Sequence, residues 1–485
     1  MSILGIDLGT QSVKVATVAT GDHGARVLES ATRAYPVESP HAGWAESDPA
    51  AWLAATLEAA REVLGRLQEP PRAIGLSGQM HGVVLCGDDG EPLRRAITWA
   101  DLRSSAQARR ISAELGPQGL ARLGSAAFPG FAGPTLAWLA DEEPAVLSSA
   151  RWALQPKDWL RFALGGAVAT DPSDASGTLL YDVVDGEWSP AALEACRVDP
   201  ALLAPIVASQ AVGGTVGAVG GALAGLPIAV GGADAACGNL GLGLAAGRGS
   251  IALGTGAQIA SVLAVPAPDA SLRTHTFASA GAAGDSWYRL GAVQSAGLAI
   301  QRVVSWLGAD IAEMQASLAQ GIRRDDPLFL PFVAGERSPY VAPELRGAWH
   351  GLSLGTSREA MLRSVLEGMA YVVSAAYEAV CDSGAVPEPP VTMLGGGSRD
   401  PAFVDFLATA LGVPLRPAEV GDATVVGAAR LGAAMAGMDL PPVVAREHAT
   451  VDPREDALTE ERQRRWRALV ESSLRDAQAG EGSGT

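Results

Sequence analysis

The sequence is poor in lysine and in basic charge overall. Its 485 residues contain 36 lysines and arginines against 53 acids, which gives a formal net charge of −17. A nucleic acid or an anionic membrane would need a basic face, so we predict neither as a partner. Lys14 and Lys157 are the only lysines. Neither ends a GxxxxGK[ST] pattern, so a Walker-type phosphate loop is excluded.

Cysteine is also scarce, and its spacing excludes two kinds of site. No CxxC pair occurs, so we predict neither a disulfide framework nor a zinc site. The N-terminus has no basic segment ahead of its apolar run, so we expect no secretory signal peptide. Both features favour a reducing, cytoplasmic compartment. The four cysteines are Cys86, Cys196, Cys237 and Cys381.

One long uncharged stretch, residues 211–233, is long enough to cross a bilayer. It contains several glycines and Pro227, which disfavour the interior of a helix. We therefore predict short strands and turns there. Hydrophobic residues make up 48% of the chain, enough for a sizeable core, and the length suggests two or three domains.

The first hundred residues alternate strand and helix patterns. Residues 3–8 and 13–18 form apolar runs on either side of a Gly-Thr turn, which predicts a β-hairpin. Helical spacing of apolar residues follows at 49–67. Residues 73–77 then indicate a buried strand that ends in a polar turn at 78–82. This alternation predicts an α/β fold.

The hairpin pattern recurs half a chain later. The segment Leu8-Gly9-Thr10-Gln11-Ser12 is echoed by Leu253-Gly254-Thr255-Gly256-Ala257. The echo predicts two similar domains that meet near Gly241, although chance similarity of two Gly-Thr turns explains it equally well.

The second half shows the same alternation. We expect a long helix from about Thr356, where Thr356 and Glu359 fit a capping box. A strand follows at 391–394, then a loop at 395–398 and a helix from Pro401. The polar, glycine-rich residues 480–485 predict a disordered tail.

Two acids stand in apolar surroundings. Asp7 interrupts the first apolar strand, and Asp234 follows an uncharged run at the end of another. A carboxylate in such a place is costly unless it meets a partner, a metal or a substrate. For Asp234, capping of a helix that starts at Ala235 is an equally good interpretation.

The Gly-Thr turns suggest what the acids serve. Consecutive backbone N–H groups in such turns form concave anion sites. Two facing hairpins could hold the phosphates of a nucleotide, with Mg²⁺ held by carboxylates between them. Gly395-Gly396-Gly397 would let a nucleotide approach the backbone, or they form an ordinary strand-to-helix loop.

Together these motifs resemble the FGGY carbohydrate kinase family, most closely its xylulokinases, over nearly the whole chain. Their joint order and spacing carry the resemblance. The matching segments are residues 5–10, 77–82, Trp99 with Asp101 and Arg103, 156–158, 231–234, 253–256, 331–332 with 335–337, and 394–397.

The resemblance implies two actin-like, ribonuclease H-like α/β domains that flank a catalytic cleft. Residues 1–240 would mainly bind sugar and 241–479 would mainly bind ATP. It also implies ATP-dependent phosphorylation of a ketopentose, D-xylulose above all, with ATP and Mg²⁺ required. The assembly state stays open, with a homodimer as one expectation.

The resemblance also assigns roles to residues. Asp234 would be the general base and, with Asp7, a Mg²⁺ ligand. The sugar would contact Asp234 and four further residues, and the nucleotide would contact turns from both halves. For His81, a purely structural role is the alternative. The expected sugar contacts are Met80, His81, Asp101 and Arg103, and the expected nucleotide contacts are Thr10, Gln11, Gly254, Thr255, Gly395, Gly396 and Gly397.

Two positions depart from the xylulokinase pattern. Ala100 and Ala235 stand where those enzymes usually have asparagine. Each lost amide removes roughly 0.5–1.5 kcal/mol if it bound a sugar hydroxyl. Another pentulose, a deoxy-ketose or a polyol is therefore an alternative substrate, and an actin-like ATPase without sugar kinase activity is the alternative of another class.

Overall fold

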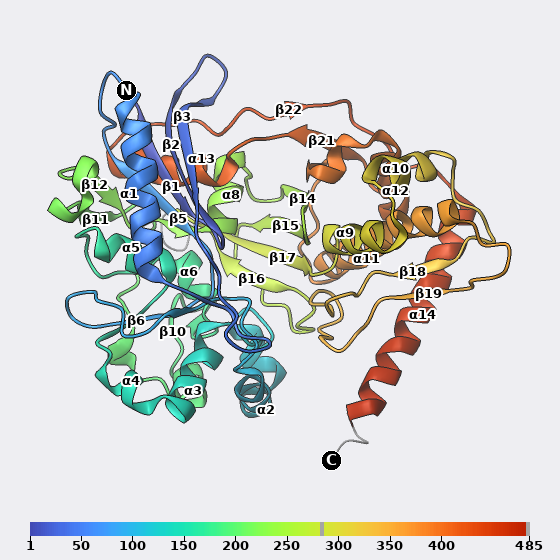
Figure 1. Cartoon of the computed structure of the whole chain (residues 1–485), viewed down its shortest axis with the longest axis horizontal. Coiled ribbons are helices and arrows are strands. Elements are labelled where there is room, and N and C mark those ends of the chain that lie inside the picture. Colours follow the sequence, from blue (N-terminus) through green and yellow to red (C-terminus); the bar gives the residue numbers. More distant parts are fainter. Residues whose placement is uncertain (282–285, 482–485) are drawn as a thin grey trace.

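The computed structural model describes residues 1–281 and 286–481 as two lobes, each built around a seven-stranded sheet (Figure 1). In the first sheet the strand order is β11-β12-β5-β1-β2-β3, and β13 pairs with β5 beside β12. Its strands are β1 (Ile3–Leu8), β2 (Ser12–Thr20), β3 (Ala25–Ala34), β5 (Ile74–Gly78), β11 (Val212–Thr215), β12 (Pro227–Ala229) and β13 (Gly232–Ala233).

The second sheet repeats the plan of the first. In each sheet an antiparallel hairpin, β1–β2 or β14–β15, lies beside a parallel strand, β5 or β20. The predicted repeat is therefore present in the fold. In order across the sheet, the strands are β16 (His275–Ala278), β17 (Trp287–Val293), β15 (Ala257–Leu263), β14 (Gly249–Leu253), β20 (Val391–Gly395), β21 (Leu415–Glu419) and β22 (Arg446–Glu447).

Helices and short strand pairs surround the two sheets. The helices of the first half are α1 (Pro49–Gly65), α2 (Ser105–Arg122), α3 (Ala132–Glu142), α4 (Pro144–Ser149), α5 (Pro156–Ala163), α6 (Pro172–Ser176), α7 (Pro190–Cys196) and α8 (Asp234–Leu242). Those of the second half are α9 (Gly297–Leu307), α10 (Ile311–Ala319), α11 (Arg358–Asp382), α12 (Pro401–Leu411), α13 (Ala423–Met435) and α14 (Ala457–Glu481).

The remaining elements are short. The 3₁₀ turns are η1 (Pro200–Leu202), η2 (Ala218–Leu223) and η3 (Gly396–Arg399). The two-stranded pairs are β4 (Glu46–Ser47) with β7 (Ala96–Ile97), β6 (Val84–Cys86) with β8 (Trp152–Leu154), β9 (Tyr181–Asp182) with β10 (Glu187–Trp188), and β18 (Leu328–Leu330) with β19 (Ala348–His350).

Most sequence expectations for local structure are confirmed. The hairpin, the helix from Pro49, the strand near residue 74 and the helix from Pro401 all form. The uncharged stretch folds into β11, η2, β12 and β13, and none of the described helices is both long and apolar enough to cross a membrane. The loop after β20 contains the single 3₁₀ turn η3.

Two expectations need correction. Helix α11 begins at Arg358, close to the expected start, but its capping residue is Ser357 and not Thr356, because the Ser357 hydroxyl accepts the N–H of Ala360. Helix α14 extends to Glu481, so the first two residues of the expected disordered tail are helical, and 482–485 lie outside the described residues. The predicted division at Gly241 falls in the last turn of α8 and stays a prediction.

The first sheet is covered by helices from both halves of the chain. Alternate residues of β1 face opposite sides, as a strand requires. Leu4 and Ile6 pack in one cluster with Trp52 of α1, whereas Ile3 packs with Val426 of α13. Helix α13 also contacts β5 and α8, so the second half of the chain supplies one face of the first lobe.

Helix α13 packs so closely against β5 and α8 that no side chain fits at three positions. A Cβ added to Gly75 of β5 would lie 1.6 Å from the carbonyl oxygen of Ala428, and one added to Gly427 would lie 1.8 Å from that of Cys237. At Gly241 the corresponding distance, to Ala423, is 1.9 Å. Glycine is therefore required where α13 meets β5 and α8.

We predict that Gly241→Ala destabilises the fold, whereas Gly238→Ala in the same helix does not. The added methyl at 241 must displace α13, and such overpacking costs roughly 1–3 kcal/mol. A Cβ at Gly238 meets its nearest atom at 3.7 Å and gains helix propensity. Urea denaturation curves of both variants check this, and equal midpoints would contradict the close contact.

Candidate active site

Two carboxylates meet at one edge of the first sheet. Strands β1 and β13 both run parallel to β5, with Asp7 opposite Ser77 and Ala233 opposite Gly78. Asp234 directly follows Ala233 as the first residue of α8. The carboxyl ends of neighbouring parallel strands are where ligands bind in open α/β sheets.

The environment of Asp7 disfavours its charge. Burial, followed by the charge of Asp234, raises the pKa of Asp7 to about 7, although Ser77 and Lys14 oppose the shift. Its Oδ1 atom is buried without a hydrogen-bond partner among the described residues. An orphaned carboxylate oxygen beside a second acid suits a divalent cation or its water.

Asp234 is less strongly perturbed. Burial raises its pKa to about 6, while the N–H of Ala235, which donates to Oδ1 at 2.6 Å, lowers it. The residue occupies the first position of α8 rather than the cap before it. A carboxyl with this pKa is ionised at neutral pH and can still accept a proton readily.

The first hairpin turn lies beside the two acids. Gly9 closes the turn by donating to the carbonyl of Ser12 at 3.0 Å. The Trp99 indole donates to Thr10 Oγ1 at 2.9 Å, and Gln11 is exposed. Thr10 and Gln11 thus stand at an open turn, as a phosphate contact requires.

The second hairpin turn meets the glycine loop. Gly254 and Thr255 are exposed, and their carbonyls accept the first N–H groups of α9 at 3.1 and 2.8 Å. Gly395 pairs with Leu253 and has φ +87°, and a Cβ there would lie 2.2 Å from the Leu253 carbonyl oxygen. Only glycine fits at this position.

A cavity of about 270 Å³ opens between these two segments and helices α9, α10, α11 and α12. Its largely apolar lining with a few polar groups is typical of a site that binds a small organic molecule. The loops contribute backbone and the helices contribute side chains. It is lined by Leu253, Gly254, Gly297, Ile300, Gln301, Ile311, Met314, Gln315, Leu366, Met369, Gly396, Gly397, Asp400 and Phe403.

The polar turn after β5 holds Met80 and His81 against the second lobe. His81 has φ +73° and stacks on Phe131 at 4.0 Å between ring centroids. Burial lowers the pKa of His81 to about 3, so the ring is neutral. Its Nδ1–H donates to the carbonyl of Gly177 at 2.6 Å, which leaves Nε2 as an acceptor. The Tyr288 hydroxyl lies 3.9 Å from Met80 Sδ.

The structure joins Asp101 and Arg103 to each other. The Arg103 guanidinium donates two hydrogen bonds of 2.8 Å to the Asp101 carboxylate. This carboxylate also accepts the N–H of Ala45 at 2.6 Å. Arg103 also stacks on Trp44, with 3.5 Å from Cζ to the ring centroid. Asp101 is therefore occupied by protein donors, whereas Nη1 of Arg103 has no partner among the described residues.

Arg337, to which the sequence analysis gave no role, lies against aromatic side chains of the first lobe. Its guanidinium carbon lies 5.2 Å from the ring centroid of Trp99 and 5.7 Å from that of Phe128. Glu336 supports it by accepting the backbone N–H groups of Gln294 and Arg337 at 2.5 and 2.9 Å. The Gly335–Arg337 motif was visible in the sequence, but only the fold brings it to the first lobe.

Comparison with known proteins shows which family the chain belongs to. The N-terminal domain of the FGGY family of carbohydrate kinases matches residues 2–241, and the C-terminal domain of that family matches residues 249–436. The xylulose kinase of Escherichia coli (strain K12) is 31% identical and covers 97% of this chain and 99% of its own. That of Streptomyces rubiginosus is 32% identical and covers 92% and 91%.

Solved structures give the same result. The crystal structure of a "xyloylose kinase" from Brucella ovis is 31% identical, has a TM-score of 0.88, and covers 97% of this chain and 99% of its own. A xylulose kinase from Rhodospirillum rubrum, at 24% identity, shares the fold with a TM-score of 0.86 and covers 99% and 100%. The family and the actin-like two-domain fold predicted from the sequence are thus confirmed: the chain belongs to the FGGY family of carbohydrate kinases.

Proposed function

We propose that this sugar kinase uses ATP to phosphorylate a ketopentose, D-xylulose, to D-xylulose 5-phosphate. The carrying observation is Asp234, a carboxylate of raised pKa at the strand ends, where β13 and β1 flank β5, the strand that leads into the sugar turn. Relatives named xylulose kinase, at 31–32% identity over most of both chains, support the choice of sugar.

Asp234 is the general base in this proposal. It removes the proton of the terminal primary hydroxyl as that oxygen attacks the γ-phosphorus of ATP. The new oxygen–phosphorus bond forms while the bond to the β–γ bridging oxygen breaks, and ADP leaves. Phosphoryl transfer depends mainly on positioning and charge neutralisation, so a base held in a fixed frame suits it.

In this proposal the two turns bind the phosphates of the nucleotide, and the cavity binds its adenine ring. Thr10 and Gln11 from the first lobe and Gly254 and Thr255 from the second would contact the phosphates. Gly396 and Gly397, directly after Gly395, line the cavity, whose apolar walls suit an adenine ring. The ADP-bound glycerol kinase of Plasmodium falciparum shares this fold with a TM-score of 0.87 at 20% identity.

Asp7 and Asp234 would hold Mg²⁺. The orphaned Oδ1 of Asp7 fits this role, because a cation would satisfy an oxygen that no protein group reaches among the described residues. When bound, Mg²⁺ neutralises phosphate charge. The charges of the two acids, which disfavour each other, would be balanced at the same time.

The expected sugar contacts, cellular compartment and assembly state also belong to this proposal. Met80, His81 and the Asp101–Arg103 pair would border the sugar. All four cysteines are free thiols, which fits a cytoplasmic enzyme. The homodimer stays a prediction.

We predict that Asp234→Asn lowers kcat by about 10²–10⁴, because an amide cannot accept the hydroxyl proton. ATP affinity should change little, since most of the nucleotide contacts lie on other segments. Steady-state assays with D-xylulose and calorimetric ATP binding check both points. Asp22→Asn, in the exposed turn after β2, serves as control. Near-normal turnover of Asp234→Asn would contradict its role as the base.

We predict that activity falls as pH is lowered through about 6, and that saturating Mg²⁺ moves the fall to lower pH. Asp234 must be ionised to accept a proton, and burial raises its pKa to about 6. At low Mg²⁺ the fall should begin nearer 7, because the pKa of Asp7 is raised to about 7 and the cation competes with protons there. A kcat/KM profile that is flat down to pH 5 would contradict this.

We predict relaxed discrimination against a deoxy-ketopentose. Alanine at 100 and at 235 leaves methyl groups where related enzymes offer amides, and an unpaired sugar hydroxyl there is unfavourable. A water or a neighbouring side chain at each gap would instead give ordinary xylulokinase specificity. The test compares kcat/KM for D-xylulose and 1-deoxy-D-xylulose in the native protein, Ala100→Asn and Ala235→Asn. An unchanged ratio would show that the alanines do not set specificity.

A further inference from the structure

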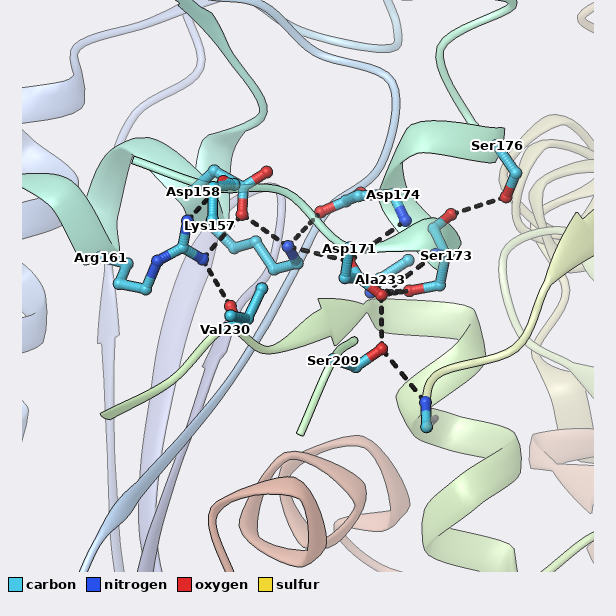
Figure 2. Close-up of polar contacts among 12 residues, drawn as sticks. Lys157, Asp158, Arg161, Asp171, Ser173, Asp174, Ser176, Ser209, Val230 and Ala233 are labelled. Atoms are coloured by element: carbon cyan, nitrogen blue, oxygen red, sulfur yellow. Dashed lines mark hydrogen bonds and ion pairs between the residues drawn. The ribbon is translucent and has the colours of Figure 1, made fainter. Parts of the chain in front are cut away.

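A cluster of charged side chains lies buried beside the proposed base. The ammonium of Lys157 lies 2.6 Å from Asp158, 3.0 Å from Asp171 and 3.1 Å from Asp174 (Figure 2). All four side chains are at most 1% exposed. Burial of this much charge is costly unless every group is paired, so a cluster of this kind calls for an explanation.

Arg161 extends the cluster toward the strand that leads to Asp234. Its Nη1 atom lies 2.9 Å from Asp158 and donates to the carbonyl of Val230 at 2.5 Å (Figure 2). Two cations thus face three carboxylates. Burial raises the pKa of Asp174, although Lys157 opposes the shift, so a proton on Asp174 would leave the cluster neutral.

A chain of hydrogen bonds connects Lys157 to the residue before Asp234. Asp171 pairs with Lys157 and accepts the hydroxyl hydrogen of Ser173 (Figure 2). Ser173 Oγ in turn accepts the backbone N–H of Ala233 at 2.9 Å. A hydroxyl that donates to a carboxylate is a good acceptor, because hydrogen bonds in a chain strengthen one another.

The strand that this chain holds is short and is otherwise fixed by its pairing with β5. Strand β13 has two residues, and Gly231 before it has φ +92°. Ser209 also fixes this segment, because its hydroxyl donates to Asp171 at 2.7 Å and its carbonyl accepts the N–H of Gly231 at 2.9 Å. The backbone ahead of Asp234 is therefore held from the side of α6.

The same short helix also reaches the sugar turn and the second lobe. The carbonyl of Gly177, directly after α6, accepts from His81 at 2.6 Å. Ser176 Oγ accepts the N–H of Ala278 in β16 at 3.1 Å. Helix α6 and the residue after it thus bond to the segment before the proposed base, to the sugar turn and to the second sheet, and fix their relative positions.

We propose that Ser173, held by Asp171 and Lys157, is a positioning residue that fixes Asp234 against the substrate hydroxyl. The proposal rests on Asp234 as the base of the proposed function. Loss of the Ser173 hydroxyl leaves the buried N–H of Ala233 unpaired and removes one of the few contacts that fix the short strand. A misplacement of about 1 Å in a reacting group can cost about 10²-fold in rate.

The test is a double-mutant cycle between Ser173→Ala and Asp234→Asn. We measure kcat, sugar KM and ATP KM with Mg²⁺ and the best substrate of a ketose panel. In the native background Ser173→Ala should lower kcat by about 10–100-fold, with ATP KM nearly unchanged. In the Asp234→Asn background it should lower the residual kcat little further, because the group that it positions no longer acts.

Ser374→Ala is the matched control. Ser374 is a buried serine of α11 whose hydroxyl, like that of Ser173, both donates and accepts: it donates to the carbonyl of Ala410 at 3.0 Å and accepts from the Gln463 amide at 2.9 Å. It should lower thermal stability without a selective loss of kcat. If Ser173→Ala does not fold, Ser173→Cys replaces it in the cycle, because a thiol fills the space but is a weak acceptor.

Two results would overturn the proposal in distinguishable ways. An equal loss of kcat from Ser173→Ala in both backgrounds, with Asp234→Asn strongly impaired, would show that Ser173 does not act through the base. A fully active Asp234→Asn would overturn the base assignment itself and this proposal with it.

Discussion

The rest of the structure depends on the contact of α13 with β5 and α8, where backbone meets backbone. Glycines 75, 427 and 241 make it possible, since a Cβ at any of them would lie within 2 Å of a carbonyl carbon or oxygen. Strand β5 leads into the turn with Met80 and His81, and α8 begins with Asp234. One helix from the second half therefore sets the relative position of both sides of the site.

The site needs rigid surroundings because the burial of two neighbouring carboxylates costs free energy. Asp7 and Asp234 are both poorly hydrated, and the charge of Asp234 raises the pKa of Asp7 further. Sites of this kind persist where the surrounding structure determines their geometry. Here the determining groups are the close helix packing on one side and the Lys157 cluster on the other, both buried and both rich in direct backbone contacts.

The sequence predicted those features that a short segment determines by itself. The Gly-Thr turns and the acids at strand ends follow from short segments, and the structure has them in place. Thr356 and Ser357 are both able to cap a helix, and in the structure Ser357 does so while the Thr356 hydroxyl accepts the N–H of Ser353 in the preceding loop. The frame that holds Ser173 was not predictable, because its partners at 157, 209 and 233 meet only in the fold. The sequence singled out Asp101 and Arg103 as sugar contacts, which stays a prediction, but it did not indicate that the two side chains pair with each other.

The position of α13 also constrains how the protein can be made. This helix belongs to the second half of the chain but covers a face of the first sheet. During synthesis, which proceeds from the N-terminus, β1 and β5 are complete within the first eighty residues, yet that face stays uncovered until residue 435 has left the ribosome. The first lobe therefore cannot mature as an independent unit on the nascent chain, and its exposed apolar strands make the long interval before release a period of vulnerability to aggregation.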